Sequence, residues 1–230
     1  SRVISSGRNV VVEKPLSYDY LHIKKLSDMA KEKGVSLICS YHAAFSNDVK
    51  YFLDNRANLE DGLGKLVGFE CDFYDPYYLD GLRLPQSDSL HGSYLDSAIN
   101  ALSVIARILG LERMSSVTDV RPFISKDNLH SEVFYEKDGI NGVIRTDWRK
   151  GLNLKKTKLI YEGGHLLLHH SMQRIEKFDG ENTDILDCNA EKAERLLNQY
   201  LSTICALENG SADIVPHSTM YKLLLGYEDN

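Results

Sequence analysis

The residue best placed to do chemistry is Lys14. The tripeptide Glu13-Lys14-Pro15 ends Asn9-Val-Val-Val-Glu13, a short β-branched run typical of a parallel strand buried on both faces. Ligands of doubly wound sheets sit beyond the carboxyl ends of the strands, and Pro15 stiffens the turn that presents the lysine. An ammonium group at such a point can hydrogen-bond an oxygen and carry its proton. The tripeptide alone equally allows an ordinary charged residue in a surface loop.

A second polar group shares one face of a helix expected over residues 95–109. Asp96, Asn100, Ser103 and Arg107 recur at helical spacing opposite an apolar stripe. Residues four apart lie on one helix face, so Asp96 and Asn100 could contact the same ligand. The pattern by itself favours a plainer interpretation, in which all four residues form the solvated side of an amphipathic helix.

The histidines and cysteines of the sequence do not match the spacing of a known metal site or disulfide pattern. His165 and His169 would share one face of a strand, but His170 would point away, and no carboxylate or cysteine completes a site. The four cysteines are widely spaced, with no C-x-x-C pair, which favours reduced thiols and a cytoplasmic protein. The sequence therefore predicts no metal centre.

The first elements form one βαβ unit. A strand over 9–13, a helix over about 18–33 and a second strand over 35–40 require a parallel pair. One such unit is too small to stand alone. We therefore expect residues 1–45 to be the last part of a larger doubly wound sheet.

From residue 46 the pattern becomes that of an α+β domain, 46–230. Consecutive strands with few intervening helices predict a large, mostly antiparallel, open sheet covered by helices on one face, and Asp138-Gly139 is a tight hairpin signal. The expected strands span 65–73, 115–124, 130–137, 140–148, 155–161 and 165–171. A final helix over about 189–208 is expected to turn an apolar side inward, made of Ala193, Leu196, Leu197, Tyr200, Leu201 and Ile204.

Composition excludes several classes of partner. The 230 residues are 43% hydrophobic and 26% charged, which suits a globular protein with a real core. Lys and Arg number 27 against 33 Asp and Glu, a net charge of -6, so the chain lacks the basic surface that nucleic acids or anionic membranes attract. No apolar run approaches the roughly 18 residues needed to span a bilayer.

The ordered motifs resemble the Gfo/Idh/MocA family of oxidoreductases, named after glucose-fructose oxidoreductase, inositol dehydrogenase and a rhizopine-pathway protein. The resemblance rests on the stretch 9–17 with its E-K-P motif, on Tyr41-His42 at the end of the second strand, and on Gly62-Leu-Gly-Lys65 before the next strand. It also rests on the glycine-led stretch 92–102, which carries Asp96 and Asn100. The resemblance extends over essentially the whole chain.

This resemblance implies an NAD- or NADP-dependent oxidoreductase that acts on a sugar, a polyol or a related hydroxy compound. Lys14 would lie near the nicotinamide and help to move the substrate proton, while Glu13 and Pro15 would border the cofactor. Residues 1–45 would be the C-terminal remnant of a Rossmann domain. The residues that would face the substrate are Tyr41, His42, Tyr94, Asp96 and Asn100. Members of this family usually pair through the open face of the sheet, which implies a homodimer or homotetramer.

Asn100 departs from the family pattern, which usually has histidine there. Asparagine donates and accepts hydrogen bonds but cannot act as an acid or base. Lys14 must then carry the proton alone, or Tyr94, His91 or His42 must assist. The same substitution leaves a second interpretation open, a ligand-sensing or regulatory homologue that kept the fold without turnover.

The phosphate-binding fingerprint of a dinucleotide domain is missing from the sequence. Gly62-x-Gly64 does not qualify, because it precedes a strand rather than a helix. The residue that selects NAD or NADP is missing with it. We expect roughly 100 further residues upstream, since a complete dinucleotide domain needs them.

Overall fold

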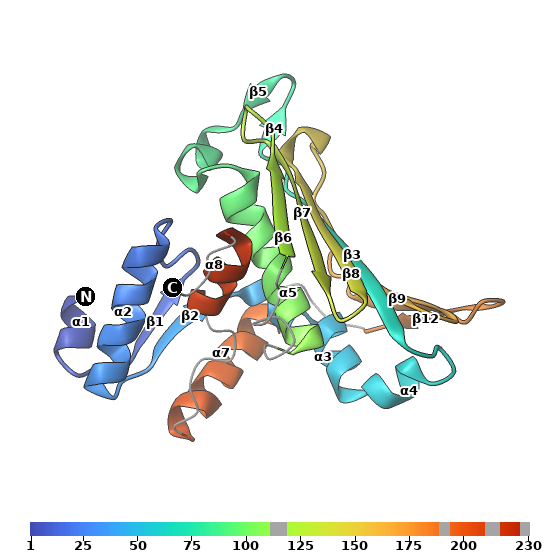
Figure 1. The fold of residues 1–230 in the computed structure, drawn as a ribbon, viewed down its shortest axis with the longest axis horizontal. Coiled ribbons are helices and arrows are strands. Elements are labelled where there is room, and N and C mark those ends of the chain that lie inside the picture. The colour runs from blue at the N-terminus through green and yellow to red at the C-terminus, as the bar shows by residue number, and fades with distance from the viewer. Residues whose placement is uncertain (111–118, 189–193, 210–216, 226–230) are drawn as a thin grey trace.

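The computed structural model describes residues 1–110, 119–188, 194–209 and 217–225. A small βαβ unit lies to one side of a large sheet, and helices fill the space between the two (Figure 1). Residues 115–118 and 189–193 of the expected elements lie outside the described residues. No helix in the described ranges is both long enough and apolar enough to cross a membrane.

The βαβ unit has the order that the sequence predicts. Strand β1 (Val10–Glu13) pairs in parallel with β2 (Leu37–Ser40), and helix α2 (Tyr20–Lys33) connects them. The short helix α1 (Arg2–Ser5) packs against α2. The carboxylate of Asp19, not the expected Ser17, caps α2 by accepting a hydrogen bond from the backbone of Leu21 at 2.9 Å.

The large sheet has eight strands in the order β12-β11-β10-β9-β3-β8-β7-β6. Only β3 and β8 pair in parallel within it, so the expected mostly antiparallel sheet is confirmed among the described residues. The Asp138-Gly139 turn joins β7 to β8, with positive φ at both residues. The strands are β3 (Leu66–Tyr74), β6 (Asp119–Ile124), β7 (His130–Lys137), β8 (Ile140–Asp147), β9 (Leu154–Tyr161), β10 (Gly164–His169), β11 (Arg174–Phe178) and β12 (Thr183–Asp187). A separate two-stranded hairpin is formed by β4 (Tyr78–Leu79) and β5 (Leu82–Arg83).

The helices cover one face of the large sheet (Figure 1). Phe73, Ile144 and Leu159 point into this layer and are fully buried. The covering segments are η1 (His42–Phe45), α3 (Asn47–Asp54), α4 (Arg56–Glu60), η3 (Tyr94–Ala98), α5 (Ile99–Leu109), α7 (Glu194–Glu208) and α8 (His217–Leu225). The remaining short turns are η2 (Pro85–Leu90) and η4 (Trp148–Lys150).

The polar stripe of the 95–109 helix is not a solvated surface, so the solvated position that the pattern favours is wrong for Ser103 and Arg107; for Asp96 and Asn100 the family resemblance already implied a site that faces the substrate. Asp96, Asn100 and Ser103 are 3%, 6% and 0% exposed, and Arg107 is half-buried. The reason is that α5 packs against β3, η1 and α8 and is therefore enclosed on several sides. A polar residue in such a helix needs a partner inside the protein or a ligand.

The orientation expected for the last long helix is also wrong. In α7, the residues that face the protein and are buried are Gln199, Thr203 and Ala206. The apolar residues expected to point inward are instead 41–56% exposed: Leu196, Leu197, Tyr200, Leu201 and Ile204. Polar bonds hold the helix in this orientation, since Asn198 Nδ2 donates to Asn47 Oδ1 at 2.5 Å and to the Phe45 carbonyl at 3.2 Å.

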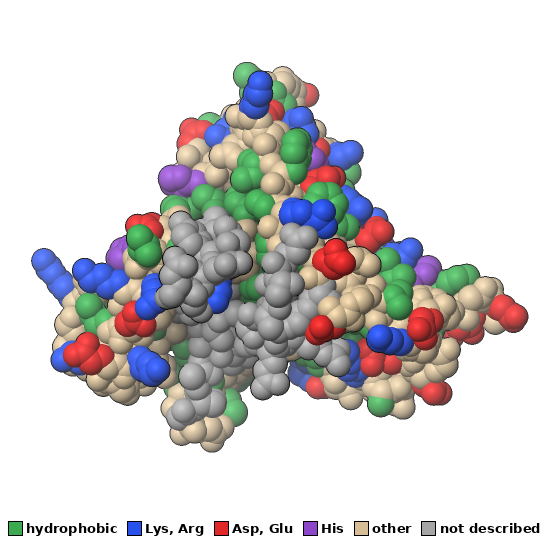
Figure 2. All heavy atoms as spheres, in the orientation of Figure 1, with side chains coloured by type: hydrophobic (Ala, Val, Ile, Leu, Met, Phe, Trp, Pro, Cys, Tyr) green, Lys and Arg blue, Asp and Glu red, His purple; other side chains and the backbone are tan. Residues whose placement is uncertain are grey.

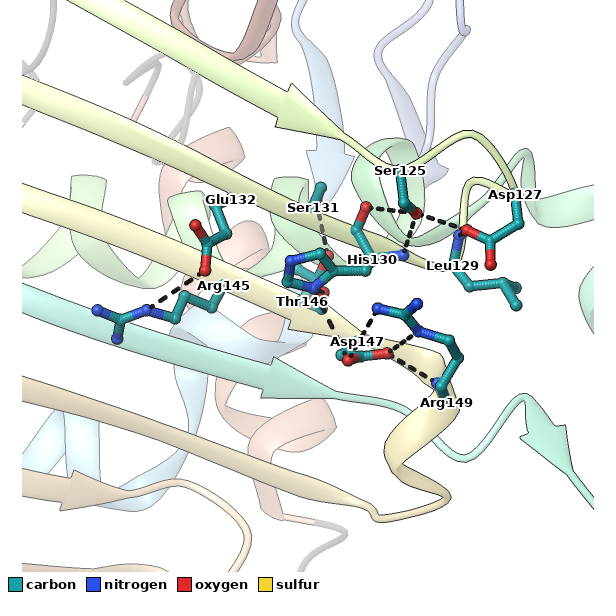
Figure 3. A network of polar contacts seen from close by, with 10 residues as sticks. All are labelled: Ser125, Asp127, Leu129, His130, Ser131, Glu132, Arg145, Thr146, Asp147 and Arg149. Atoms are coloured by element: carbon teal, nitrogen blue, oxygen red, sulfur yellow. Dashed lines mark hydrogen bonds and ion pairs between the residues drawn. The ribbon is translucent and has the colours of Figure 1, made fainter.

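The face of the sheet opposite the helices carries paired charges. Arg145 lies 3.4 Å from Glu70, 3.6 Å from Asp72 and 3.9 Å from Glu132, each distance joining a guanidinium nitrogen to a carboxylate oxygen. Figure 3 shows the Arg145–Glu132 contact and, nearer the strand ends, Asp147 between His130 and Arg149. Acidic and basic side chains are likewise interspersed on the face drawn in Figure 2.

Candidate active site

Lys14 and Asp96 form an ion pair between the two parts of the fold. Lys14 directly follows β1, and its Nζ donates to the Asp96 carboxylate and, at 3.2 Å, to the Asp96 backbone oxygen. The two side chains are 13% and 4% exposed. Asp96 lies in η3, a π-helical turn that leads into α5; such turns are frequent at functional sites. The structure thus brings together the two motifs that the sequence singled out.

The charge of the Asp96 carboxylate is sensitive to its surroundings. Burial raises the pKa of Asp96 above its usual range, and the nearby carboxylate of Asp75 raises it further. The ammonium groups of Lys14 and Lys155 act in the opposite direction. A carboxyl group balanced between these influences is typical of a site that handles protons.

A second ion pair, Asp75–Lys155, lies beside the first, and the sequence pattern did not predict it. Lys155 Nζ is 2.6 Å from Asp75 Oδ1, and the other carboxylate oxygen of Asp75 accepts a hydrogen bond from Ser97 Oγ at 2.6 Å. Trp148, fully buried, donates its Nε1–H to the same Ser97 oxygen at 2.9 Å. Because Ser97 follows Asp96 in η3, this chain of contacts fixes Asp75 next to the first pair.

His42 lies close to both lysines. Burial lowers its pKa to about 4, and the charges of Arg195, Lys14 and Lys155 contribute to the decrease. The imidazole is therefore neutral near pH 7. A neutral imidazole can donate one hydrogen bond and accept another, so His42 can orient a hydroxyl group without adding charge.

Asn100 is buried with an unpaired polar atom. Its side-chain Oδ1 accepts no hydrogen bond within the described part of the chain, although Asn100 is 6% exposed. An unpaired buried carbonyl oxygen is costly, and a hydroxyl or amine of a ligand would satisfy it. Its position one turn after Asp96 places it on the same helix face.

The structure places the other expected residues in different settings. Tyr94 donates its hydroxyl to the backbone oxygen of Leu224 in α8, and that bond would have to break before Tyr94 could contact a substrate. Tyr41 is fully buried immediately after β2. His91 packs against Tyr18 with the two rings tilted by 41° and their centroids 3.9 Å apart.

Glu13 and Pro15 flank Lys14 at the carboxyl end of β1. Glu13 is exposed, Pro15 is partly exposed, and the Lys14–Pro15 peptide bond is cis. The backbone there is accessible beside the ion pair, as a strand end that borders a cofactor must be. In the described ranges, no group of three or more His, Cys, Asp or Glu side chains is arranged to hold a metal ion.

Comparison with curated proteins finds two oxidoreductases, while no family model matches. The chain is 29% identical over 109 residues to the uncharacterized oxidoreductase YhhX of Escherichia coli, a match that covers 46% of this chain and 31% of that protein. It is 33% identical over 85 residues to an uncharacterized oxidoreductase of Schizosaccharomyces pombe, covering 36% of this chain and 21% of the relative. The matched stretches thus span about a third or less of these relatives.

Solved structures of dehydrogenases share the fold over nearly the whole chain. UDP-N-acetylglucosamine 3-dehydrogenase GnnA of Acidithiobacillus ferrooxidans has a TM-score of 0.76 and 15% identity, covering 98% of this chain and 71% of its own. Levoglucosan dehydrogenase, solved with NADH and levoglucosan, has a TM-score of 0.76 and 12% identity, covering 96% and 70%. A Gfo/Idh/MocA family oxidoreductase of Vibrio cholerae has a TM-score of 0.71 and 13% identity, covering 97% and 70%. The resemblance to Gfo/Idh/MocA oxidoreductases is therefore confirmed at the level of the fold.

Proposed function

We propose that this chain is the catalytic and substrate-binding part of an NAD- or NADP-dependent oxidoreductase that acts on a sugar, polyol or related hydroxy compound. One observation carries the proposal: the Lys14–Asp96 ion pair, which links the end of β1 to the turn that opens α5. A lysine and an aspartate from two parts of a dehydrogenase-like fold meet at the point where such folds bind ligands.

The nicotinamide, when bound, supplies or accepts the hydride. Glu13 and Pro15 would border it through the backbone at the carboxyl end of β1. Levoglucosan dehydrogenase was solved with NADH, and another fold relative, the 3-ketoreductase KijD10 of Actinomadura kijaniata, was solved with NADP, which supports a nicotinamide cofactor without choosing between the two. In this proposal residues 1–45 belong to a dinucleotide-binding domain and residues 46–230 form the substrate-binding domain.

Lys14 would handle the substrate proton. When the substrate alcohol is oxidised, its hydroxyl proton passes to Lys14 Nζ as Lys14 passes a proton on to the hydrogen-bonded Asp96 carboxylate; in the reverse direction the ammonium gives a proton to the forming hydroxyl and recovers one from Asp96. Asp96 holds Lys14 in place and balances its charge. Asn100 cannot exchange a proton, and His42, with a pKa of about 4, is a weak base near pH 7, so neither replaces Lys14.

The side chains around the pair suit a substrate with several hydroxyl groups. The Asp75 carboxylate accepts hydrogen bonds, the Lys155 ammonium donates them, and Asn100 and His42 can do both. A polyhydroxy compound presents adjacent donors and acceptors that match such a set. The levoglucosan bound to one fold relative is a compound of this class.

Self-association through the open face of the sheet is part of the proposal. The face carries both signs of charge, and Phe123 and Phe134 are 55% and 39% exposed on it. In this proposal a two-fold axis sets the face against the same face of a second copy, since aromatic residues and arginine are enriched at interfaces.

The second candidate function, a ligand-sensing homologue without turnover, is favoured by Asn100 alone. One experiment distinguishes the two functions. The full-length protein is assayed for NAD- and NADP-dependent oxidation of a panel of polyols and aldoses. Turnover that Lys14→Met abolishes supports the oxidoreductase; binding of a sugar without turnover supports the sensor.

A further inference from the structure

A cavity of about 200 Å³ lies among α3, η1, α5 and α7, apart from the Lys14–Asp96 pair. Its lining includes the buried Phe45, the half-buried Arg107, and Leu201 and Ser202 of α7. A water molecule occupies about 30 Å³ of liquid. The cavity therefore has room for a small solute together with several waters.

Arg107 enters this cavity with unused hydrogen-bonding capacity. Its guanidinium lies over the ring of Phe45, 3.8 Å from the ring centroid. The Nη1 atom is buried and donates no hydrogen bond within the described ranges. Burial lowers the pKa of Arg107 to about 10, and the charge of Asp54 only partly opposes this decrease. The ring of Phe45 thus stabilises the guanidinium by stacking, but no acidic group fully neutralises its positive charge.

The acidic side chain on the cavity wall is already engaged. Asp54 Oδ2 is 2.5 Å from Lys50 Nζ, one helical turn away, so the two charges largely balance each other. Among the charged residues that line the cavity, a net positive charge remains, and it belongs to Arg107.

Arg56 provides an internal comparison. Its guanidinium also lies over a phenylalanine, Phe52, at 5.4 Å from the centroid. In contrast to Arg107, it donates to Glu60 at 3.0 Å and to the Ile108 carbonyl at 2.9 Å. An arginine packed against an aromatic ring in this fold can therefore have hydrogen-bond partners at two of its nitrogens, whereas Arg107 lines a cavity.

We propose that this cavity is an anion-binding site in which Arg107 receives a small carboxylate or phosphate group. The planar guanidinium matches two oxygens of either group, and the ring of Phe45 holds it in plane. Ser202, also on the cavity wall, can donate a further hydrogen bond to the anion. The proposal is independent of the redox activity proposed above.

Isothermal titration calorimetry of the wild-type chain tests the site, with sodium phosphate and sodium malonate as separate probes and sodium chloride holding the ionic strength constant. We expect saturable binding of one anion per chain for at least one probe. Binding of phosphate alone or of malonate alone identifies the group that the site prefers. Binding of neither overturns the proposal.

Arg107→Met and Arg56→Met are the matched variants. Arg107→Met should weaken binding by at least about tenfold, because a charged hydrogen-bonding group is lost, whereas Arg56→Met should leave the affinity unchanged. Equal affinity of wild type and Arg107→Met overturns the proposal. Should Arg107→Met fail to fold, Ser202→Trp fills the cavity and keeps Arg107. Loss of binding in that variant supports the site, and unchanged binding overturns it.

Discussion

The ammonium of Lys14 and the carboxylate of Asp96, 82 residues apart in the sequence, are hydrogen-bonded across the junction between the βαβ unit and the large sheet. Each residue alone has an unremarkable setting, a strand end and a helical turn. Together they place an amine and a carboxyl group in one site with little exposure to water.

Asp96→Asn should lower stability as well as activity. Without the carboxylate, the Lys14 ammonium is left without its partner in a site where it is 13% exposed. We expect the free energy of unfolding to fall by about 3 kcal/mol, the usual cost of removing one partner of a buried ion pair. Urea unfolding measures this change, with Asp28→Asn as control because Asp28 is 63% exposed in its pair with Lys24. Equal losses in the two variants would contradict the structural role of Asp96.

The Asp75–Lys155 pair should affect substrate binding more than the chemical step. Lys155→Met is expected to raise KM for a polyol by about tenfold with a smaller change in kcat, since uniform binding is lost. Lys156→Met is the matched control, because Lys156 points to the opposite face and contacts Asp72 at 3.4 Å. The single tryptophan, Trp148, is joined to Asp75 through Ser97 and gives a fluorescence readout of ligand binding. A fall in kcat with unchanged KM would refute this assignment.

Asn100→His should add an ionisation to the pH profile. The imidazole that replaces the amide exchanges protons near pH 6.5, whereas asparagine has no titration. We expect kcat/KM of the variant to gain a limb on the acid side of about pH 6.5 that the wild type lacks, since burial lowers the pKa of a histidine. Identical profiles for the two proteins would mean that position 100 does not take part in proton handling.

The buried Asp48–His170 pair should govern stability in acid. Asp48 is fully buried, and its Oδ2 is 2.5 Å from His170 Nδ1. Burial alone would raise the pKa of Asp48, but the charge and hydrogen bond of His170 outweigh it, so the pKa is lowered. A lowered folded-state pKa contributes stability above the unfolded value of about 3.9, and this contribution is lost as the pH falls through the folded value.

Urea unfolding at pH 7, 5 and 3 tests this linkage. Asp48→Asn should cost about 3 kcal/mol at pH 7 and show a shallower loss of stability below about pH 4 than the wild type. The exposed Asp28→Asn again serves as control. If Asp48→Asn and wild type lose stability in parallel, Asp48 is not the titrating group.

Local patterns predicted the elements that carry the site. The β-branched residues before Glu13 predicted the strand that ends just before Lys14, and the Asp138-Gly139 pair predicted the turn between β7 and β8. Both depend on neighbours in the chain, which a sequence displays directly. Strands β11 and β12 were not expected, because charged residues such as Arg174, Glu176 and Lys177 interrupt the apolar pattern there.

Long-range packing decided the features that the sequence did not predict. The Asp75–Lys155 contact joins residues 80 apart, brought together because β3 and β9 are neighbours in the sheet. The burial of Arg107 follows from the position of η1 against α5, and the outward apolar side of α7 follows from its polar bonds to Phe45 and Asn47. Periodicity identifies the face of a helix but not what covers it.

The central claim, that Lys14 moves the substrate proton, is tested most directly by the kcat of Lys14→Met and Lys14→Arg. The assay uses the full-length protein and whichever polyol or aldose it oxidises. Lys24→Met is the control. Both Lys14 variants should lose at least about a hundredfold in kcat, because methionine holds no proton and arginine does not release one near pH 7. Wild-type turnover in Lys14→Met, or full rescue by Lys14→Arg, would contradict the account.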